Sequence, residues 1–458
     1  MLNLDQWLWL DNTVFVVQMW FAGWFYFKNK NHFNSSIVAL SLLLLQIFFL
    51  SPNTKLVFGS ARNLDLWRFY LDSARVPGFE RFRWNDVLMI LLLVGALSNI
   101  TQKVVKRAGG VLGSLIALIV IGTISILNIV YDFDFVRYFL TIKIYCVALL
   151  FLAVGLAIAD KGSSSNDERN LNQMMVFFGL GTASLLALAQ EFRWGRYGNN
   201  NFIPSPGLWV FPLIYFFRLL YSKNINFIRR APVLIGFLSI IIVPSKTIYL
   251  EVFVFVLIYL VYRINPRVFK SINRIPSLLA ALIVAVSAGP FIVLFVSLFT
   301  SVQLVDVDLS ISTRQKQVVN VYETLEGRGL SGLAIGIGHG QWYKVTQEFE
   351  EFDTGAWTDE EAGELNYRAA TQVPMLSVFR STGLIGTSVL LLVCFMVARA
   401  SCFCGVDASN NAFGISITFL TVSIFSQMPE LGFESVGIAA LNMGQILHRR
   451  EPLLVQTR

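Results

Sequence analysis

Apolar residues form long runs along the whole chain, and polar residues are concentrated between them. A membrane-spanning helix needs about 20 apolar residues, so the shorter runs are expected to extend by several positions. We count thirteen runs, at residues 12–27, 36–51, 86–100, 110–131, 138–159, 174–190, 207–221, 231–245, 248–263, 276–302, 373–396, 411–428 and 435–447. The pattern predicts an all-α, polytopic transmembrane helical bundle of about 12 to 14 spans. Residues 1–458 are expected to form a single membrane domain.

The longest polar interval lies between the tenth and eleventh runs, at residues 303–372. We expect it to form a large loop subdomain outside the membrane-spanning bundle. Within it, "RQKQVVNVYETLEG" places Val318, Val319 and Tyr322 on one face of a helix, because positions three and four apart are neighbours there. The interval is therefore expected to contain helix as well as loop.

Composition agrees with a membrane protein, since 55% of the 458 residues are hydrophobic and 14% are charged. Charged residues make up about 25% of ordinary soluble domains, which excludes that class. We expect membrane lipids among the partners and no nucleic acid.

Basic segments alternate regularly with the apolar runs. They follow the first, third, fifth, seventh, ninth and last runs, as "KNKNH", "TQKVVKR", "DKGSSSNDERN", "RLLYSKNINFIRR", "YRINPRVFKSINR" and "HRREP". Lysine and arginine in short loops mark the cytoplasmic side of a membrane. The pattern predicts a multi-pass protein with its N-terminus outside and its C-terminus in the cytoplasm.

Further basic residues fall on the predicted outer side, in residues 53–86, 191–207 and 243–247 and in the interval 303–372. Arginine favours planar, two-point contact with phosphate or carboxylate oxygens. These arginines therefore indicate an anionic head group held at the outer membrane surface. The alternative is that the side chains extend to the head groups of surrounding lipids.

The stretch "AIGIGHGQW" contains three glycines at alternate positions beside a histidine. A nucleotide-binding loop is excluded here, because no Gly-Lys-Ser/Thr ending and no βαβ unit accompany the glycines. We expect Gly336, Gly338 and Gly340 to form a tight turn in which the backbone approaches another group closely.

The segment "STRQKQVVNVYETLEGRGLSGLAIGIGHGQW", followed by "VPMLSVFRSTGLIG", resembles the conserved region of the O-antigen ligase and O-antigen polymerase superfamily. That region has an arginine, a glycine-rich turn, an outer loop and a final helix carrying Gly-x-x-Gly. Two upstream segments, "RYGNNNFIPSPGLWVF" and "PSKTIYLEVFVFVLIYL", are similar to the family in order and position. The matched residues are Arg314, Gly336, Gly338, Gly340, Gly383, Gly386, Arg196, Gly198, Pro204 and Ser245, with Lys246 where the family has arginine.

The resemblance implies a GT-C-like glycosyltransferase of the bacterial cytoplasmic (inner) membrane. Such enzymes transfer glycan from an undecaprenyl-pyrophosphate-linked donor to a sugar hydroxyl on the outer face, without a metal ion or other cofactor. The implied partners are the undecaprenyl-pyrophosphate-linked glycan, a flippase and chain-length regulator proteins. We therefore expect a polymerase of O-antigen or exopolysaccharide, acting on a lipid-linked acceptor.

One departure from the family concerns the choice between polymerase and ligase. Ligases carry a His-Asn or His-Ser pair shortly before the Gly-x-x-Gly, and this chain has Thr371 and Gln372 there. The departure favours the polymerase over an O-antigen ligase that transfers glycan to lipid A-core. A lipid-linked oligosaccharide flippase is a further alternative, although it would place more charge inside the spans than Lys143 and Glu251.

The resemblance also implies roles for individual residues. Fixed guanidinium groups would stabilise the charge that builds up on the departing pyrophosphate. The candidates for this role are Arg314, Arg196 and Lys246, with Arg193 added from its position on the predicted outer side.

The acceptor hydroxyl needs a base, and the outer segments offer Glu364 and Glu191. His339 is a further catalytic candidate, although a lone histidine in a loop is more often a structural residue. Trp342 and Trp357 are candidates for stacking on glycan rings. Two Asp-x-Asp pairs, at residues 132–134 and 306–308, lack further ligands, so no metal site is expected.

Overall fold

The computed structural model describes residues 75–76, 79–83, 90, 93–94, 101–128, 135–160, 220, 246–271, 276–297, 309–347, 367–368, 371, 373–401, 408–428 and 433–448. Most of these residues are helical, which confirms the predicted all-α class. The predicted runs at residues 12–27, 36–51, 174–190 and 231–245 lie outside the described residues.

Seven of the predicted apolar runs correspond to described helices. They are α6 (Gln102–Ile124), α7 (Phe135–Asp160), α11 (Lys246–Ile264), α13 (Pro276–Ser297), α17 (Leu376–Ser401), α18 (Ala408–Ser426) and α19 (Phe433–His448). A 3-10 turn, η1 (Ser125–Asn128), continues α6. Most helix ends lie within a few residues of the predicted bounds, whereas α6 begins earlier because its first turn is the basic segment "QKVVKR".

Among the described residues, α17 is the one helix that is long and apolar enough to cross a membrane by itself. The apolar parts of five other helices are shorter, at Ala108–Ile124, Thr141–Ala157, Val252–Ile264, Leu279–Phe291 and Asn411–Ser426. Length and composition of the described helices therefore give one candidate span.

Four helices expose large apolar side chains at helical spacing. The exposed positions are Ile116, Val120 and Ile124 on α6, Phe253, Leu257, Leu260 and Ile264 on α11, Leu282, Val286, Val293 and Val296 on α13, and Leu384, Ile385 and Leu392 on α17. Soluble proteins rarely expose contiguous apolar surface of this kind, and such faces normally contact lipid or another protein.

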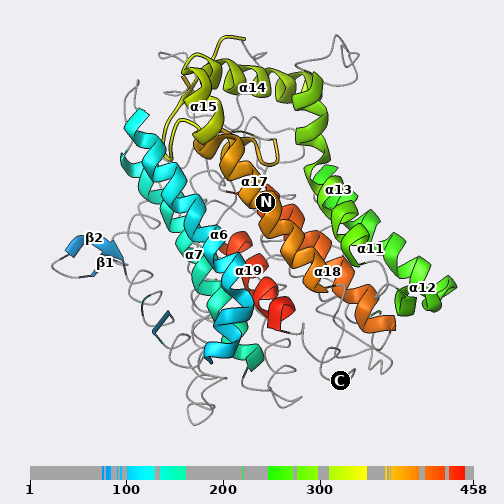
Figure 1. The fold of residues 1–458 in the computed structure, drawn as a ribbon. Helices are drawn as coiled ribbons and strands as arrows, with labels where there is room; N and C mark the ends of the chain where they lie inside the picture. Colours follow the sequence, from blue (N-terminus) through cyan, green and yellow to red (C-terminus); the bar gives the residue numbers. More distant parts are fainter. Residues whose placement is uncertain are drawn as a thin grey trace, which may run out of the picture.

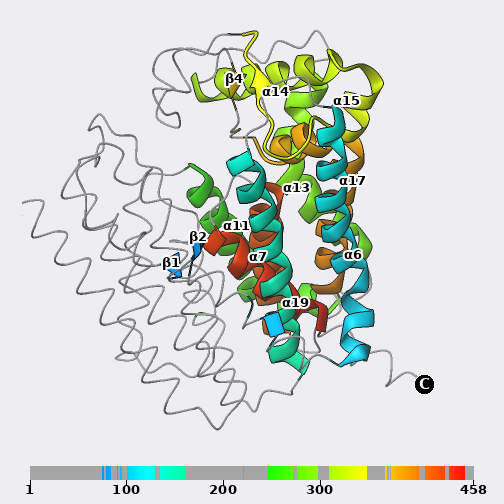
Figure 2. The ribbon, with the colours of Figure 1, turned by 90° about the vertical axis from the view of Figure 1, so that its left-hand side faces the viewer.

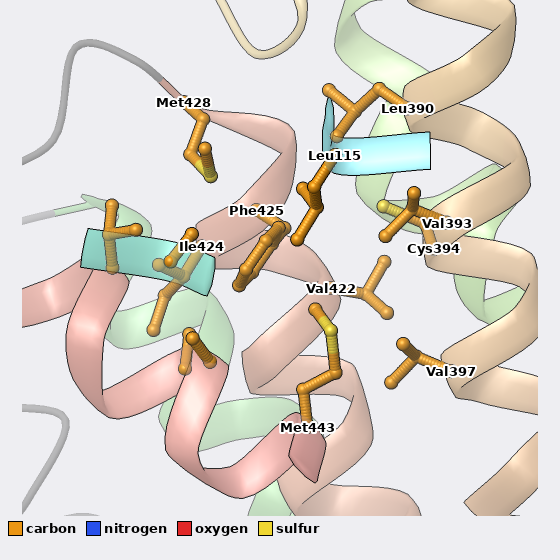
Figure 3. Packing of buried hydrophobic residues seen from close by; sticks show 14 of the residues in the cluster. Leu115, Leu390, Val393, Cys394, Val397, Val422, Ile424, Phe425, Met428 and Met443 are labelled. Atoms are coloured by element: carbon orange, nitrogen blue, oxygen red, sulfur yellow. The ribbon is translucent and has the colours of Figure 1, made fainter. Parts of the chain in front are cut away.

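The apolar core lies between these helices. Figure 3 shows Leu115 of α6, Val393 of α17, Phe425 of α18 and Met443 of α19 meeting in one cluster, and all four are buried. Figure 2 shows α6 beside α17 and α7 beside α19, and these helices contact each other. The core thus joins helices from both halves of the described chain.

Among the described helices, α7 and α19 make the most extensive contact, and it depends on two glycines. A Cβ atom on Gly155 would lie 2.3 Å from the Leu441 carbonyl oxygen, and one on Gly444 would lie 2.5 Å from the Leu152 carbonyl oxygen. Since any side chain would collide with backbone, the two helices can approach this closely only at glycine.

The interval 303–372 contains the helices α14 (Leu309–Glu326) and α15 (Gly329–Ile335), which lie across the upper end of the bundle in Figure 1. The helix predicted from Val318, Val319 and Tyr322 is therefore confirmed as part of α14. A short helix, α12 (Pro266–Ser271), lies at the opposite end.

Two short two-stranded antiparallel sheets were not predicted. One pairs β1 (Arg75–Val76) with β2 (Phe79–Arg83), and the other pairs β3 (Tyr343–Lys344) with β4 (Tyr367–Arg368). Strands of two to five residues carry too little alternation of apolar and polar positions to be recognised in the sequence.

Candidate functional site

The glycine turn is the centre of the candidate site, and it is buried. Residues 336–341 are all buried, although the sequence placed them in a large outer loop. The backbone N–H of Ile337 donates to the Arg380 carbonyl oxygen at 2.8 Å, and that of Gly338 donates to the Ser381 carbonyl oxygen at 3.0 Å. The N–H of His339 donates to the Gly122 carbonyl oxygen at 3.0 Å. The turn is therefore bonded to α17 on one side and to α6 on the other.

Gly336 and Gly383 are in direct backbone contact. A Cβ atom on Gly336 would lie 2.4 Å from the backbone nitrogen of Thr382, and one on Gly383 would lie 2.4 Å from the carbonyl carbon of Ala334. Their φ angles are 79° and 62°, in the left-handed region that favours glycine. Both the contact and the backbone conformation thus require glycine at these positions.

The contact interrupts α17. Gly383 has φ 62° and ψ −161°, so α17 consists of two helical pieces joined at this residue. The expectation of one continuous final helix over residues 373–396 is therefore wrong at this point. The physical reason is that the Arg380 and Ser381 carbonyl oxygens bond to the glycine turn, on the N-terminal side of the break.

The other motif glycines also allow close packing. Gly338 and Gly340 have φ angles of 97° and 77°, and a Cβ atom on Gly338 would lie 2.9 Å from the backbone nitrogen of Ile126. A Cβ atom on Gly386 would lie 1.9 Å from Oγ1 of Thr382. Both glycines of the Gly-x-x-Gly segment therefore lie where a side chain would collide.

His339 packs over α6 and contacts α7. Its Nε2 lies 3.2 Å from the Leu118 carbonyl oxygen, which can only accept, so Nε2 carries the proton. Its Nδ1 is then an acceptor, and it is buried with no hydrogen-bond partner. The ring of Tyr145 lies 5.3 Å away, centroid to centroid. A Cβ atom on Gly122 would lie 2.1 Å from Nε2, so this α6 glycine makes room for the imidazole.

His339 lies in the turn, outside the long apolar helices, and its environment keeps it neutral. Burial lowers its pKa to about 4; the positive charge of Arg380 also lowers it, while the hydrogen bond to the Leu118 carbonyl opposes the change. At neutral pH the imidazole is therefore uncharged and a weak base. This favours the structural role over the catalytic role that the sequence left open.

Arg380 is a site residue that the sequence analysis missed. It lies in the first piece of α17, it is 5% exposed, and its charge acts on His339. A signal was present, because Arg380 is the one charged residue in the apolar run at residues 373–396. Charges within such runs are rare and usually functional.

Arg314 belongs to the same end of the bundle. It lies early in α14, which contacts both α15 and α17, and its side chain is half-buried. The Nε atom is fully buried and has no hydrogen-bond partner. The Arg314 helix therefore packs on the helix that leads into the glycine turn and on the helix that carries the Gly-x-x-Gly segment.

Two buried amides near the turn differ in their hydrogen bonding. Asn320 of α14 donates to the Gln347 carbonyl at 3.1 Å and accepts from the Thr346 and Gln347 backbone N–H groups at 3.1 and 2.8 Å. It thereby fixes the chain that follows the turn. Gln341 is fully buried, and neither its amide nitrogen nor its amide oxygen has a partner. Asn320 is structural, whereas Gln341 has capacity to bind a polar group.

The position of the ligase histidine is occupied by an internal contact. Thr371 is buried, and its Oγ1 lies 2.6 Å from Oγ of Ser377. The Thr371 hydroxyl is thus part of the support for α17 rather than a base.

Of the remaining candidate residues, two lie among the described residues and the others do not. Lys246 is the first residue of α11, and Trp342 is half-buried directly after the turn. Arg193, Arg196, Glu191, Glu364, Trp357 and both Asp-x-Asp pairs lie outside the described residues. Within the described part of the chain, no group of three or more His, Cys, Asp or Glu side chains is arranged to hold a metal ion.

The chain matches no protein-family model, no curated protein and no solved structure. A function must therefore be argued from its residues and their geometry.

Proposed function

We propose that this protein is a polysaccharide polymerase of the bacterial cytoplasmic membrane that transfers glycan from undecaprenyl pyrophosphate to the sugar hydroxyl of a lipid-linked acceptor. One observation carries the proposal. The glycine turn, which contains Gly336, is hydrogen-bonded to α17 at Arg380 and Ser381, shortly before Gly383, and α14 with Arg314 packs on α17 and on α15, the helix that leads into the turn. Three segments that carry the resemblance in the sequence therefore form one unit in space.

A membrane location is supported by the exposed apolar faces of α6, α11, α13 and α17. In water these faces would be an aggregation hazard, whereas in a bilayer they would contact hydrocarbon. The basic helix α12 and the arginine-bearing end with α14 lie at opposite ends of the bundle (Figure 1), which is the separation that a cytoplasmic and an outer face require.

In the proposed reaction, the acceptor hydroxyl oxygen attacks the anomeric carbon of the donor glycan. The bond from that carbon to the pyrophosphate oxygen breaks, its electron pair stays on the pyrophosphate, and the hydroxyl proton passes to a base. Arg314 and Arg380 would stabilise the developing negative charge, together with the candidates Arg196, Arg193 and Lys246. Because Arg380 is held in a buried, hydrogen-bonded segment, its charge needs little reorganisation during the reaction.

The base in this scheme is a carboxylate, with Glu364 and Glu191 as the candidates. His339 is less suited, because a pKa of about 4 makes it a weak proton acceptor. We assign it the role of holding the glycine turn on α6. The buried contact of Thr371 disfavours the ligase, which would need a base at that position.

The test uses full-length protein in proteoliposomes supplied with the lipid-linked repeat unit of its native host. We expect long glycan on lipid from the wild type, and a roughly 100- to 1,000-fold lower rate from Arg314→Ala, as for the loss of one charge-stabilising donor. Arg314→Lys should retain part of the rate, because it keeps the charge and loses the two-point contact.

Other results would identify the alternatives. Transfer to lipid A-core without chain growth would identify a ligase, and movement of the lipid-linked unit between leaflets without new glycosidic bonds would identify a flippase. An unchanged rate in a folded Arg314→Ala protein would contradict the proposed site.

A further inference from the structure

One face of α11 is apolar and exposed along the C-terminal half of the helix. Phe253, Leu257, Leu260 and Ile264 are 62%, 48%, 49% and 84% exposed. Their spacing of four, three and four residues places them on one side of the helix. Phe255, by contrast, is fully buried in the core. The row from Phe253 to Ile264, here called the α11 stripe, is therefore a surface that the fold leaves open.

Three exposed bases lie in the chain at the end of the α11 stripe or directly after it. They are Arg263 in the last turn of α11 and Arg267 and Lys270 in α12. The corner between the helices is ordered by Asn265, whose N–H donates to the Val261 carbonyl oxygen at 2.9 Å and whose Oδ1 accepts from the Arg267 N–H at 3.2 Å. We call this group of bases the α12 corner.

The α12 corner is firmly attached to the bundle. Phe269 is buried, and its carbonyl oxygen accepts a hydrogen bond of 2.9 Å from Nδ2 of Asn411 in α18. The ring of Phe269 also lies 6.2 Å from that of Tyr262. Phe269 attaches α12 to the bundle, and the exposed bases on either side of Phe269, Arg267 and Lys270, remain available to a partner.

The dimensions of this surface fit one leaflet of a bilayer. At about 1.5 Å per residue, the stretch from Phe253 to Ile264 is roughly 16 Å long. The hydrocarbon core of a bilayer is about 30 Å thick, so one leaflet spans about half of that. A row of apolar side chains of this length, ending in positive charge, matches the acyl chains and head group of a single lipid.

We propose that the α11 stripe and the α12 corner bind an anionic phospholipid. Its acyl chains lie along the stripe, and its phosphate contacts Arg263, Arg267 and Lys270. The charge selects the lipid class, because Arg263 at the end of α11, together with two bases and no acidic residue in α12, attracts an anionic head group more strongly than a zwitterionic one. The inference rests on the membrane location in the proposed function, but not on glycan transfer.

The experiment measures lipid retained by full-length protein in detergent, using native mass spectrometry with phosphatidylglycerol or phosphatidylcholine of the same acyl chains. We expect the wild type to prefer phosphatidylglycerol. The triple variant Arg263→Gln, Arg267→Gln, Lys270→Gln should bind it about tenfold more weakly, close to the level of phosphatidylcholine.

A matched control removes the same charge from three separate exposed positions, as Lys106→Gln, Lys344→Gln, Arg399→Gln. This variant should keep the preference for phosphatidylglycerol. The variant Leu257→Ser, Ile264→Ser should lower the retention of both lipids, because it disrupts the stripe and leaves the charges. Thermal unfolding without added lipid shows whether each variant is folded, and the single variant Arg267→Gln replaces the triple variant if that does not fold.

Three outcomes would overturn the inference: wild-type lipid preference in the charge-depleted variant, an equal loss in the matched control, or a stripe covered by a second copy of the chain. Glycan transfer is measured separately. A preserved lipid preference without transfer would contradict the polymerase and leave the lipid site standing, while transfer without lipid preference would do the reverse.

Discussion

Two pairs of glycines allow close contacts between distant segments of this protein, and the two contacts differ. Gly155 and Gly444 bring α7 and α19 together, and both helices remain regular. Gly336 and Gly383 bring the turn and α17 together, and both have positive φ while α17 is interrupted. The first contact joins two apolar helices, whereas the second lies beside the buried side chains of Arg380 and His339.

The first pair of glycines serves the packing of two helices, whereas the second pair serves the positioning of a side chain. The α7–α19 contact gains dispersion energy along two uninterrupted helices. The contact between the turn and α17 gives up helical hydrogen bonding at Gly383, and in return it fixes a charged side chain in a buried position. Departures from regular structure of this kind tend to occur at functional sites.

The largest expected effect comes from a substitution that forces α7 and α19 apart. Gly444→Ala would place its Cβ 2.5 Å from the Leu152 carbonyl oxygen, so the helices must separate. We expect a loss of about 3 kcal/mol or more in the free energy of unfolding, measured by thermal or denaturant unfolding in detergent.

The matched control is Gly113→Ala, an exposed α6 glycine whose added Cβ would meet no atom within 4 Å. It should raise the stability by about 0.5 to 1 kcal/mol, because alanine favours a helix more than glycine does. Equal stability changes in the two variants would show that the α7–α19 glycines are not required for close packing.

The second expected effect tests placement rather than packing. In the proposed reaction Arg380 stabilises the leaving group, so Arg380→Gln should lower the rate of glycan transfer by roughly 100-fold, equivalent to about 2.7 kcal/mol of barrier. The backbone carbonyl of Arg380 still accepts from Ile337 in this variant, so the turn should stay in place.

Kinetics distinguish this role from a structural one. We expect Arg380→Gln to lower kcat more than it raises KM, and Arg380→Lys to recover part of kcat. A fall in thermal stability that accounts for the whole loss of rate, with no recovery by lysine, would mean that Arg380 serves the fold alone.

The third effect is a loss of stability in acid that depends on His339. Its folded pKa of about 4 lies below the ordinary value of 6.5, so the unfolded chain binds more protons between these values. The contribution of neutral His339 to the free energy of unfolding is fully present above pH 6.5 and is lost as the pH falls toward 4. At pH 5 the loss is about 2 kcal/mol. Burial is the main cause of the low pKa and the charge of Arg380 adds to it, while the hydrogen bond to the Leu118 carbonyl opposes part of the shift.

The measurement compares the free energy of unfolding at pH 7.5 and pH 5 in wild type and in His339→Gln. The glutamine amide can still donate to Leu118 but does not titrate, so its variant should lose less stability over this range. Parallel pH profiles of the two proteins would contradict the assigned state of His339.

Local patterns in the sequence predicted much of the fold and only part of the site. Runs of apolar residues gave the positions of α6, α7, α13 and α17, since helix formation depends on nearby residues. The spacing of Val318 and Tyr322 gave α14 in the same way.

The interruption at Gly383 could not be predicted, because it depends on hydrogen bonds to Ile337 and Gly338, which are distant in sequence. The burial of the turn could not be predicted from local sequence either, since it depends on Gly122 and Ile126, which belong to another segment. Arg380 was overlooked because the segment was judged by its glycines. Arg314, Gly383 and Gly386 were found through the resemblance to a family, whereas the alternate spacing of Gly336, Gly338 and Gly340 indicated the tight turn by itself.

The close contact of Gly155 with Gly444 has a consequence for the order of biosynthesis. The two residues are separated by roughly 300 positions, and a ribosome adds about 5 to 20 residues per second. For some tens of seconds after α7 is made, its glycine face has no α19 to pack against. The newly made α7 must remain soluble in its surroundings over that time without its final neighbour, and a chain terminated before Phe433 would never complete the pair.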